Sequence, residues 1–338
     1  MGHFAKSVTL RTSTVAGLAV ALALPFTRSA DPLPRAGTPA AAPGFTLSVV
    51  HQFPAALVTT PKYLALSKDG NLYGATSAVG SSNGTVFRLS GGSAYTRLAT
   101  LDYARDGGPF GAPFLGTGGL LYGLTFDGGP TGIGSIYTVK PGGAITTVLA
   151  FNGTNGMYPT ALVQAPDGTL YGTTYYGGSQ GDGNAYRLPP GGTFTTLVSC
   201  TVHSCLYPIA LVIGADGNVY GISEGDKQGF GNNGQLFAVT PKFRTEVNFN
   251  TTVADRPWNL ELGRDGSFYG TLMGDIHHPG WVYELTPAGA FHIVATFNGR
   301  NGAGPDELAL GADGSLYGTT EEGGATGGGV IFRLTLPR

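Results

Sequence analysis

The stretch Asp167-Gly-Thr-Leu-Tyr-Gly-Thr-Thr174 decides the fold, because its central Tyr-Gly pair recurs six times along the chain. The spacing between successive tyrosines is 49 residues in four intervals and 48 in the last. A period of this length is typical of propellers and other repeat arrays. The six tyrosines are Tyr73, Tyr122, Tyr171, Tyr220, Tyr269 and Tyr317.

Each copy of the repeat predicts four short β-strands. In the third copy, Asp167-Gly168 joins two β-prone runs. An Asp-Gly pair there is a strong hairpin signal, because the turn needs positive φ and glycine adopts it readily. A Gly-rich loop and a Pro-Gly-Gly turn then separate two further β-prone runs, 184–188 and 194–199. Four antiparallel strands per copy predict one blade of a β-propeller.

The two ends of the repeat region predict how the ring closes. The 294 residues from 45 to 338 correspond to six repeats of 49. The last copy stops after its third strand, 330–335, whereas an extra strand-like run, 45–53, precedes the first copy. We therefore expect an all-β, six-bladed propeller of four-stranded antiparallel blades, closed by the N-terminal strand pairing with the last blade. Closure removes open sheet edges. An open β-solenoid is the alternative, and it would leave the first strand unpaired.

The Tyr-Gly pair itself has a structural interpretation. We expect each tyrosine ring to fill space between adjacent blades, since aromatic side chains bury large apolar areas. We expect each glycine to let the next sheet approach closely.

Residues 1–44 lie outside the repeat. Lys6 and Arg11 precede a 12-residue apolar run, 15–26, that small residues follow. This pattern predicts a secretory signal peptide over residues 1–30, with cleavage after either Ala30 or Ala42. The run is too short to span a bilayer, which needs about 20 residues. Residues 31–44 are rich in Pro and Ala, which predicts a flexible leader. We expect residues 45–338 to form a single propeller domain.

The composition limits the classes of partner. With a net charge of −2 and 12% charged residues, the chain has no basic surface suited to nucleic acid and no polybasic patch for a membrane. Its 57 glycines occupy fixed places in the repeat, so they read as turn residues. We expect a monomer that is secreted or held in the periplasm or cell envelope, without a membrane span.

Cys200 and Cys205 are the only cysteines of the chain and fall in one short loop. In an exported protein such a pair predicts a disulfide. A zinc site that adds His203 is the alternative, but three ligands leave the coordination of zinc incomplete.

The repeat resembles a known family. The unit Asp-Gly-x-Leu-Tyr-Gly-Thr-Thr, followed by Gly-Gly and Val/Ile-Phe-x-Leu, appears almost whole in residues 313–334. It resembles the GloVer-type tandem repeat of exported bacterial proteins, a family described as carrying a choice of anchor. The resemblance covers all six copies, although Thr117-Gly118-Gly119 replaces Asp-Gly in the second and the fifth lacks Gly-Gly. It implies an exported repeat protein and supplies no catalytic residues.

The topology of a blade divides the loops between two faces of the ring. The short turns that join first to second and third to fourth strands lie on one face, here termed the turn face. The second-to-third loops and the blade connections form the loop face; they are longer and more varied, and function concentrates in such loops. The candidate binding residues on the loop face are Asp127, Tyr175, Tyr176, Glu224, Asp226, Arg256, Trp258, Glu321 and Glu322.

Two segments offer groups that bind metals. Asp275, His277 and His278 combine a carboxylate with imidazoles, which are ligands of zinc and other transition metals. The Gly/Asp-rich segment 177–184 offers carboxylate and carbonyl oxygens to calcium, without the regular Asp spacing of calcium loops. Our main interpretation has no cofactor, and Ca²⁺ or Zn²⁺ are its alternatives.

These features favour an exported binding or interaction module that presents the loop face to a glycan or protein partner. The sequence contains no Gly-x-Ser-x-Gly elbow and no evident Ser/His/Asp set, and we expect no catalytic residues. One alternative is an extracellular carbohydrate-active enzyme that uses the carboxylates of Asp127, Glu321 and Glu322. A convergent pair of buried acids at the centre of the ring would favour that alternative. Another alternative is a structural cell-envelope protein without a small ligand.

Overall fold

The computed structural model describes residues 44–52, 61–67, 69–76, 84–90, 94–140, 143–201, 203–225, 234–240, 242–248, 257–274, 279–288, 290–311, 313–327 and 329–337. All of them belong to one compact unit, Gly37–Arg338. The predicted signal peptide and nearly all of the predicted leader lie outside the described residues.

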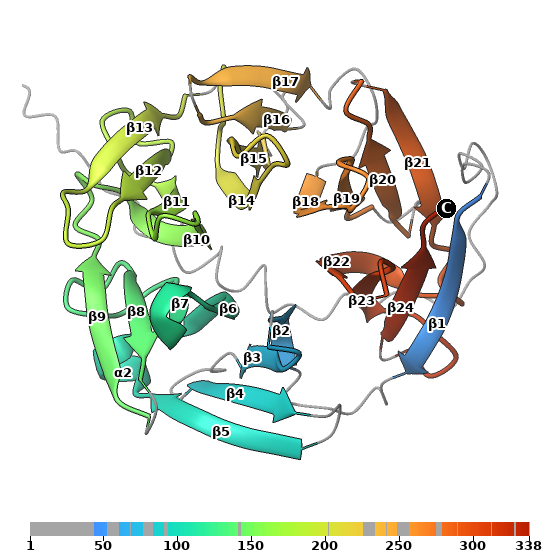
Figure 1. Cartoon of the computed structure of the whole chain (residues 1–338), viewed down its shortest axis with the longest axis horizontal. Helices are drawn as coiled ribbons and strands as arrows, with labels where there is room; N and C mark the ends of the chain where they lie inside the picture. Colours follow the sequence, from blue (N-terminus) through green and yellow to red (C-terminus); the bar gives the residue numbers. More distant parts are fainter. Residues whose placement is uncertain are drawn as a thin grey trace, which may run out of the picture. The chain divides into compact units, whose positions relative to one another are not determined.

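Six four-stranded antiparallel sheets form a ring (Figure 1). Each sheet is one blade, numbered here in chain order. The innermost strands are β2 (Pro61–Leu66), β6 (Pro109–Leu115), β10 (Met157–Gln164), β14 (Pro208–Ile213), β18 (Pro257–Leu262) and β22 (Ala303–Leu310). The second strands are β3 (Leu72–Thr76), β7 (Leu121–Thr125), β11 (Leu170–Tyr176), β15 (Val219–Ser223), β19 (Phe268–Leu272) and β23 (Leu316–Glu322).

The outer half of each blade completes the ring. The third strands are β4 (Gly84–Ser90), β8 (Ser135–Val139), β12 (Asn184–Leu188), β16 (Gln235–Ala238), β20 (Trp281–Leu285) and β24 (Val330–Thr335). The outermost strands are β5 (Ala94–Leu101), β9 (Ile145–Ala150), β13 (Thr195–Ser199), β17 (Arg244–Asn248), β21 (Phe291–Thr296) and β1 (Thr46–Gln52). The described residues add a one-turn helix, α2 (Tyr103–Asp106), and a 3-10 turn, η1 (Thr117–Gly119).

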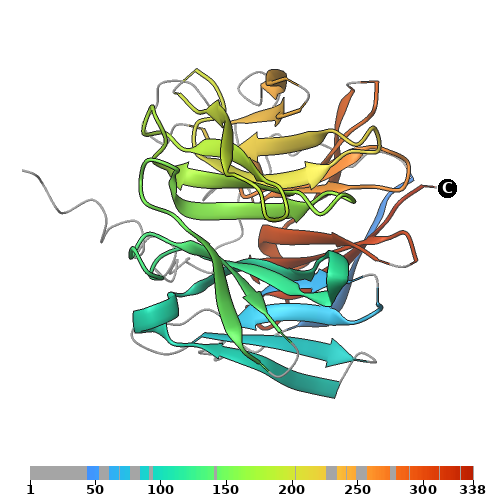
Figure 2. The same cartoon turned by 60° about the vertical axis from the view of Figure 1, so that its left-hand side comes forward.

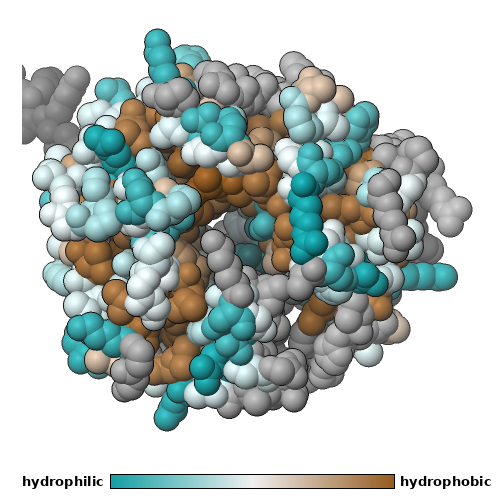
Figure 3. Space-filling view, in the orientation of Figure 1, coloured by the Kyte–Doolittle hydropathy of each residue, from teal (hydrophilic) through white to brown (hydrophobic). Residues whose placement is uncertain are grey.

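The closing strand lies where the sequence predicts it. β1 pairs antiparallel with β24, from Thr46 opposite Thr335 to Gln52 opposite Val330. The first strand of the repeat region therefore completes the sixth blade, and the six-bladed propeller is confirmed. Figure 2 shows β1 beside the last strands from a second direction. The space-filling view shows the ring hollowed at its centre (Figure 3).

The glycine of each Tyr-Gly pair lies opposite an aromatic residue of the third strand. The cross-strand partners are Phe87, Tyr137, Tyr186, Phe237, Tyr283 and Phe332. A β-carbon placed on Gly172 would lie 2.1 Å from the hydroxyl oxygen of Tyr186, so no other residue leaves room for this ring. The expectation that these glycines admit the neighbouring sheet is therefore wrong. They admit an aromatic ring of their own blade, because the two residues face each other across the ladder.

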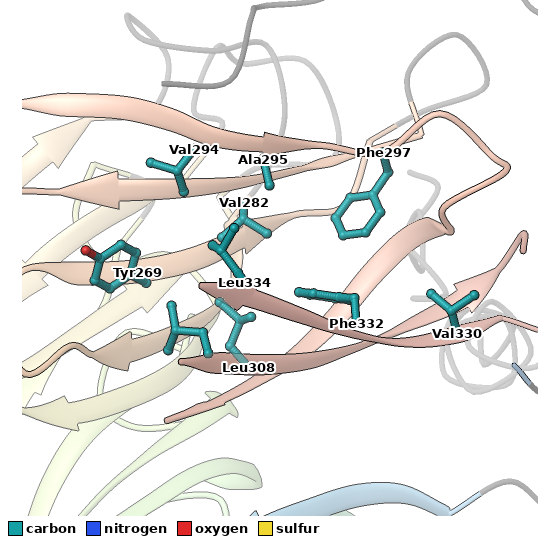
Figure 4. Packing of buried hydrophobic residues seen from close by; sticks show 10 residues of the cluster. Tyr269, Val282, Val294, Ala295, Phe297, Leu308, Val330, Phe332 and Leu334 are labelled. Atoms are coloured by element: carbon teal, nitrogen blue, oxygen red, sulfur yellow. The ribbon is translucent and has the colours of Figure 1, made fainter. Parts of the chain in front are cut away.

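Five of the six repeat tyrosines belong to, or pack against, hydrophobic clusters that span two adjacent blades, as expected. Tyr269 is fully buried among residues of blades five and six, including Leu308 and Phe332 (Figure 4). Its hydroxyl donates to Asp265 Oδ2 over 2.8 Å. In three other blades, the tyrosine donates in the same way to the turn aspartate four residues earlier. The same side chain therefore packs in the core and holds the preceding hairpin turn.

No helix in the described ranges is long and apolar enough to cross a membrane.

Tyr269→Ala is expected to lower the free energy of unfolding by roughly 3–5 kcal/mol, because it empties a fully buried site between two blades. Tyr269→Phe keeps the ring but removes hydrogen bonds to Asp265 and Glu284, and should lose only about 1 kcal/mol. Urea denaturation of the two variants measures the contribution of the whole side chain and that of the hydroxyl group alone. An alanine variant within about 0.5 kcal/mol of the wild type would contradict this account of the repeat tyrosine.

Candidate functional site

Three of the predicted binding residues meet on the loop face between blades three and four. Tyr175 and Tyr176 end β11, and Glu224 follows β15 directly. The Tyr175 hydroxyl donates to Glu224 Oε2 over 2.6 Å across a separation of 49 residues, so the two side chains occupy equivalent positions in neighbouring blades. Both are buried, at 6% and 3% exposure. Burial, together with the Glu224 carboxylate, raises the pKa of Tyr175, which keeps its hydroxyl protonated as a donor.

Two stacked aromatic pairs repeat on adjacent blades. Phe126 stacks on Tyr158 with ring centroids 4.9 Å apart and planes at 17°. One repeat later, Tyr175 stacks on Tyr207 at 4.8 Å and 8°. Tyr176 lies edge-on to both pairs, 6.2 Å from Tyr158 and 5.1 Å from Tyr207. These rings, together with Phe110 beside Phe126, form a continuous set that we term the aromatic strip. The strip consists of Phe110, Phe126, Tyr158, Tyr175, Tyr176 and Tyr207.

Two tyrosines of the strip have strained backbones. Tyr158 and Tyr207 have φ of 57° and 56°, and they are the only non-glycine residues with positive φ in the described ranges. Left-handed backbone of this kind is unfavourable by about 1–3 kcal/mol for such residues. In the sixth blade, the equivalent residue is Gly304, with φ of 62°, so the same backbone is adopted there by a glycine. Blades three and four thus keep a tyrosine where glycine would avoid the strain.

The connections before these tyrosines are held by local bonds. Before Tyr158, the amide of Asn152 donates to Asn155 Oδ1 over 2.8 Å, and the amide of Asn155 donates back to Asn152 Oδ1 over 3.1 Å. Before Tyr207, the equivalent residues are Thr201 and Ser204, which are also hydrogen-bonded to each other. Each strained residue therefore follows a closed turn that fixes where its side chain lies.

The predicted disulfide braces the second of these connections. Cys200 and Cys205 are bonded at 2.06 Å and fully buried, two residues before Tyr207. The zinc alternative with His203 is excluded in this state, because both sulfurs are engaged and His203 is exposed. A disulfide fits an extracellular protein.

The other described candidates lie apart from the strip or beside it. The Asp127 carboxylate accepts from the Tyr103 hydroxyl over 2.7 Å and from the Gly108 amide over 3.3 Å, tying the first blade connection to blade two. Trp258 Nε1 donates to Asp306 Oδ1 over 2.6 Å, between blades five and six. Glu321 and Glu322 end β23 in blade six. Of the carboxylates proposed for the enzymatic alternative, Asp127 therefore lies on blade two, apart from Glu321 and Glu322 on blade six.

The predicted metal residues Asp275, His277 and His278, together with Asp226 and Arg256, lie outside the described residues. Within the described ranges, no cluster of three or more His, Cys, Asp or Glu side chains has a geometry that suits a metal ion. In the predicted calcium segment, the loop closes on itself: the Gly177 amide donates to the Gly181 carbonyl and the Gly183 amide to the Gly177 carbonyl.

Sequence reasoning missed Phe126, Tyr158 and Tyr207, although a signal for them exists. Tyr158 and Tyr207 are one repeat apart, as are Phe126 and Tyr175. Because residues one repeat apart occupy equivalent positions in adjacent blades, aromatic residues at that spacing on the loop face predict neighbouring rings.

Sequence reasoning also missed two acids on the inner strands of blades five and six. Burial raises the pKa of Glu307 to about 8, and the charges of Asp306 and Glu261 add to this effect. Burial raises the pKa of Glu261 to about 7, against hydrogen bonds from the backbone amides of Leu262 and Leu310. At the position of Glu261, opposite the repeat tyrosine, the other blades carry Ala65, Phe114, Val163, Val212 and Ala309. A comparison of the six copies would have singled out this glutamate.

Comparison with known proteins identifies the repeat. Residues 40–237 and 207–338 match the Gloeobacter/Verrucomicrobia repeat. The chain belongs to this family. A comparison with curated proteins finds no match.

Solved structures with a similar fold include members of several enzyme classes. A gluconolactonase from Xanthomonas campestris has a TM-score of 0.60 at 15% identity, covering 91% of this chain and 95% of its own. A catalytically inactive virginiamycin B lyase from Staphylococcus aureus with quinupristin has a TM-score of 0.58 at 15% identity, covering 86% and 99%. The PQQ-bound aldose sugar dehydrogenase from Streptomyces coelicolor has a TM-score of 0.57 at 15% identity, covering 87% and 99%. At this identity, the similarity shows the propeller fold and nothing about activity.

Because the pKa values of Glu261 and Glu307 are raised in the folded state, we expect the free energy of unfolding to fall as pH rises. Folding raises the pKa values of Glu261 and Glu307 from 4.5 to about 7 and about 8, so the folded state binds these protons more tightly. Their contribution to stability is therefore complete below about pH 4.5 and is lost as pH rises through 7 to 8. Glu307→Gln, which stays neutral, should flatten the fall in unfolding free energy between pH 5 and pH 9 and be more stable than wild type at pH 9.

Urea denaturation at each pH measures this effect, and Glu321→Gln is the control because it removes a carboxylate from an exposed side chain. Parallel pH curves for wild type and Glu307→Gln would show that Glu307 titrates normally in the folded protein.

Proposed function

We propose that this chain is an exported carbohydrate-binding module that holds a glycan against the aromatic strip. The observation that carries the proposal is the pair of strained tyrosines, Tyr158 and Tyr207, retained at a position where the chain's own repeat also uses glycine. Strain of this kind concentrates at functional sites, where the surrounding structure compensates for it. The disulfide beside Tyr207 supports an extracellular setting.

The difference in burial between the residues of the strip supports its use as a binding surface. Tyr175 and Glu224 are buried and hydrogen-bonded to each other, so they act as the base of the site. Phe126, Tyr158, Tyr176 and Tyr207 are half-buried, so each residue keeps part of its surface in contact with solvent. Rigid rings held in this way lose little conformational entropy when a ligand binds.

The chemistry of the exposed rings favours a glycan over a purely apolar ligand. A tyrosine has an apolar ring face and a polar hydroxyl. A sugar ring likewise has a face of C–H groups and a rim of hydroxyls, so both parts find partners on the strip. A linear glycan also suits two aromatic pairs that repeat from one blade to the next.

A second candidate function is suggested by Glu261 and Glu307. Two carboxyls whose pKa values are raised to about 7 and about 8 include one able to donate a proton near neutral pH. Acid chemistry on a glycan uses such a pair. This candidate predicts that the wild type releases reducing ends from a glycan that binds at these two acids, and that Glu261→Gln and Glu307→Gln each abolish the release.

The binding proposal is tested by calorimetric titration of the purified protein with neutral cello-, xylo-, malto- and chito-oligosaccharides. Tyr176→Ala should lower the affinity for the bound oligosaccharide at least tenfold, which is about 1.4 kcal/mol. Tyr158→Gly should weaken binding with a smaller loss of unfolding free energy than Phe291→Ala, because glycine relieves the positive φ and so offsets part of the lost ring packing. A purely structural role for Tyr158 predicts the opposite pattern.

Phe291→Ala is the matched control. Phe291 stacks on Tyr283 at 5.4 Å and 21° in the outer part of blade five, so this variant removes an equivalent stacked ring away from the strip. Equal affinities for Tyr176→Ala and Phe291→Ala, or no oligosaccharide binding by the wild type, would refute the proposal.

A further inference from the structure

A cavity lies on the turn face, on the opposite side of the ring from the aromatic strip. Its volume is about 430 Å³, and it is lined where β2, β6 and β10 end and turn into the second strands. Sites for small ligands measure about 300–1,000 Å³, so the cavity has the size of a binding site. It shares no described lining residue with the aromatic strip.

The cavity lies where two copies depart from the repeat. The last residue of the inner strand is Leu66, Leu115, Ile213, Leu262 or Leu310 in five blades, but Gln164 in the third. The second blade is also the copy that lacks the turn aspartate. Gln164 Oε1 accepts from the Thr117 amide over 2.6 Å, and its Nε2 donates to the Gly168 carbonyl over 3.0 Å. This side chain therefore links the turns of both blades and fixes one wall of the cavity.

An aromatic ring forms a second wall. Phe114 lines the cavity and stacks on Tyr122 with centroids 5.6 Å apart and planes at 15°. At the same position in the first blade, the lining residue is Ala65, whose small side chain leaves space beside the ring. One large flat side chain and one small neighbour create the room that a ligand would occupy.

The lining selects for an uncharged ligand. None of the described lining residues is charged, and burying a charge without a partner is strongly unfavourable. β2, β6 and β10 are edge strands of their sheets, so alternate backbone N–H and C=O groups point away from the sheet. Such an edge offers donors and acceptors together, which is what hydroxyl groups require.

We propose that this cavity binds a small, neutral, polyhydroxylated molecule of mono- or disaccharide size, independently of the aromatic strip. The ligand lies against Phe114, and its hydroxyls exchange hydrogen bonds with the strand edges. Gln164 is a positioning residue, because both ends of its amide are engaged by the two turns.

The test uses the full chain and a panel of glucose, galactose, maltose and myo-inositol, with glucuronate and glucosamine as charged comparators. Saturation-transfer NMR detects binding, and calorimetric titration measures it. We expect saturable binding of at least one neutral probe and at least tenfold weaker binding of its charged comparator.

Ala65→Leu fills the cavity and should reduce the affinity for the neutral probe at least tenfold. Val212→Leu, at the same register position in blade four, is the matched control and should leave the affinity unchanged. Gln164→Leu introduces the residue type that other blades use there, so it should fold and bind several-fold more weakly. If Ala65→Leu fails to fold, the affinity of Gln164→Leu for the neutral probe serves as the test of the proposal.

Tyr176→Ala should not change the affinity of the neutral probe, which separates this site from the aromatic strip. The proposal is overturned if no neutral probe binds the wild type saturably, or if folded Ala65→Leu or, failing that, Gln164→Leu binds as the wild type does. Loss of probe binding in Tyr176→Ala would assign the probe to the strip and would also overturn it.

Discussion

Every blade depends on an aromatic ring of its third strand lying over the glycine of its second strand. A β-carbon on those glycines would lie between 2.1 and 2.7 Å from the ring or its hydroxyl, so the pair is fixed by steric exclusion. Successive residues of a strand face opposite sides, so the preceding tyrosine turns toward the other face, and in five blades it packs in a cluster shared with an adjacent blade. One dipeptide thus builds the core of a blade and joins it to its neighbour. The six copies can therefore differ in sequence at positions outside the Tyr-Gly pair and its aromatic partner.

The fold was predictable because its signals are local and repeated. The Tyr-Gly period, the Asp-Gly turns and the spare strand before residue 53 sufficed to predict the blades and their closure. The site was predictable only in part. Tyr175 and Glu224 were expected on the loop face, but their hydrogen bond depends on how two blades sit side by side. The positive φ of Tyr207 was not predictable, because tertiary packing imposes it on a residue that does not favour it.

The six copies share a scaffold but not a chemistry. Blades two to four carry the aromatic strip, whereas the inner strands of blades five and six carry the acids Glu261, Asp306 and Glu307. At the position of Glu261, the other five blades have small or apolar residues. Since the scaffold tolerates these changes, each departure from the repeat is informative. The copies of one chain can therefore be compared with one another. Such a comparison shows that Gln164 replaces an apolar residue of the other blades, and that Gly304 occupies the position of the strained tyrosines.

The pairing of β1 with β24 has a consequence for how the protein is made. Ser48 on β1 and Arg333 on β24 are 285 residues apart in sequence, yet they lie opposite each other in the ladder. A ribosome produces β1 first and its partner last, so this strand must wait unpaired while five blades are synthesised. Contacts between such distant segments form slowly, and unpaired strand edges invite aggregation in the meantime. The ring therefore passes through a vulnerable stage during its own biosynthesis, and loss of β24 would deprive β1 of its partner.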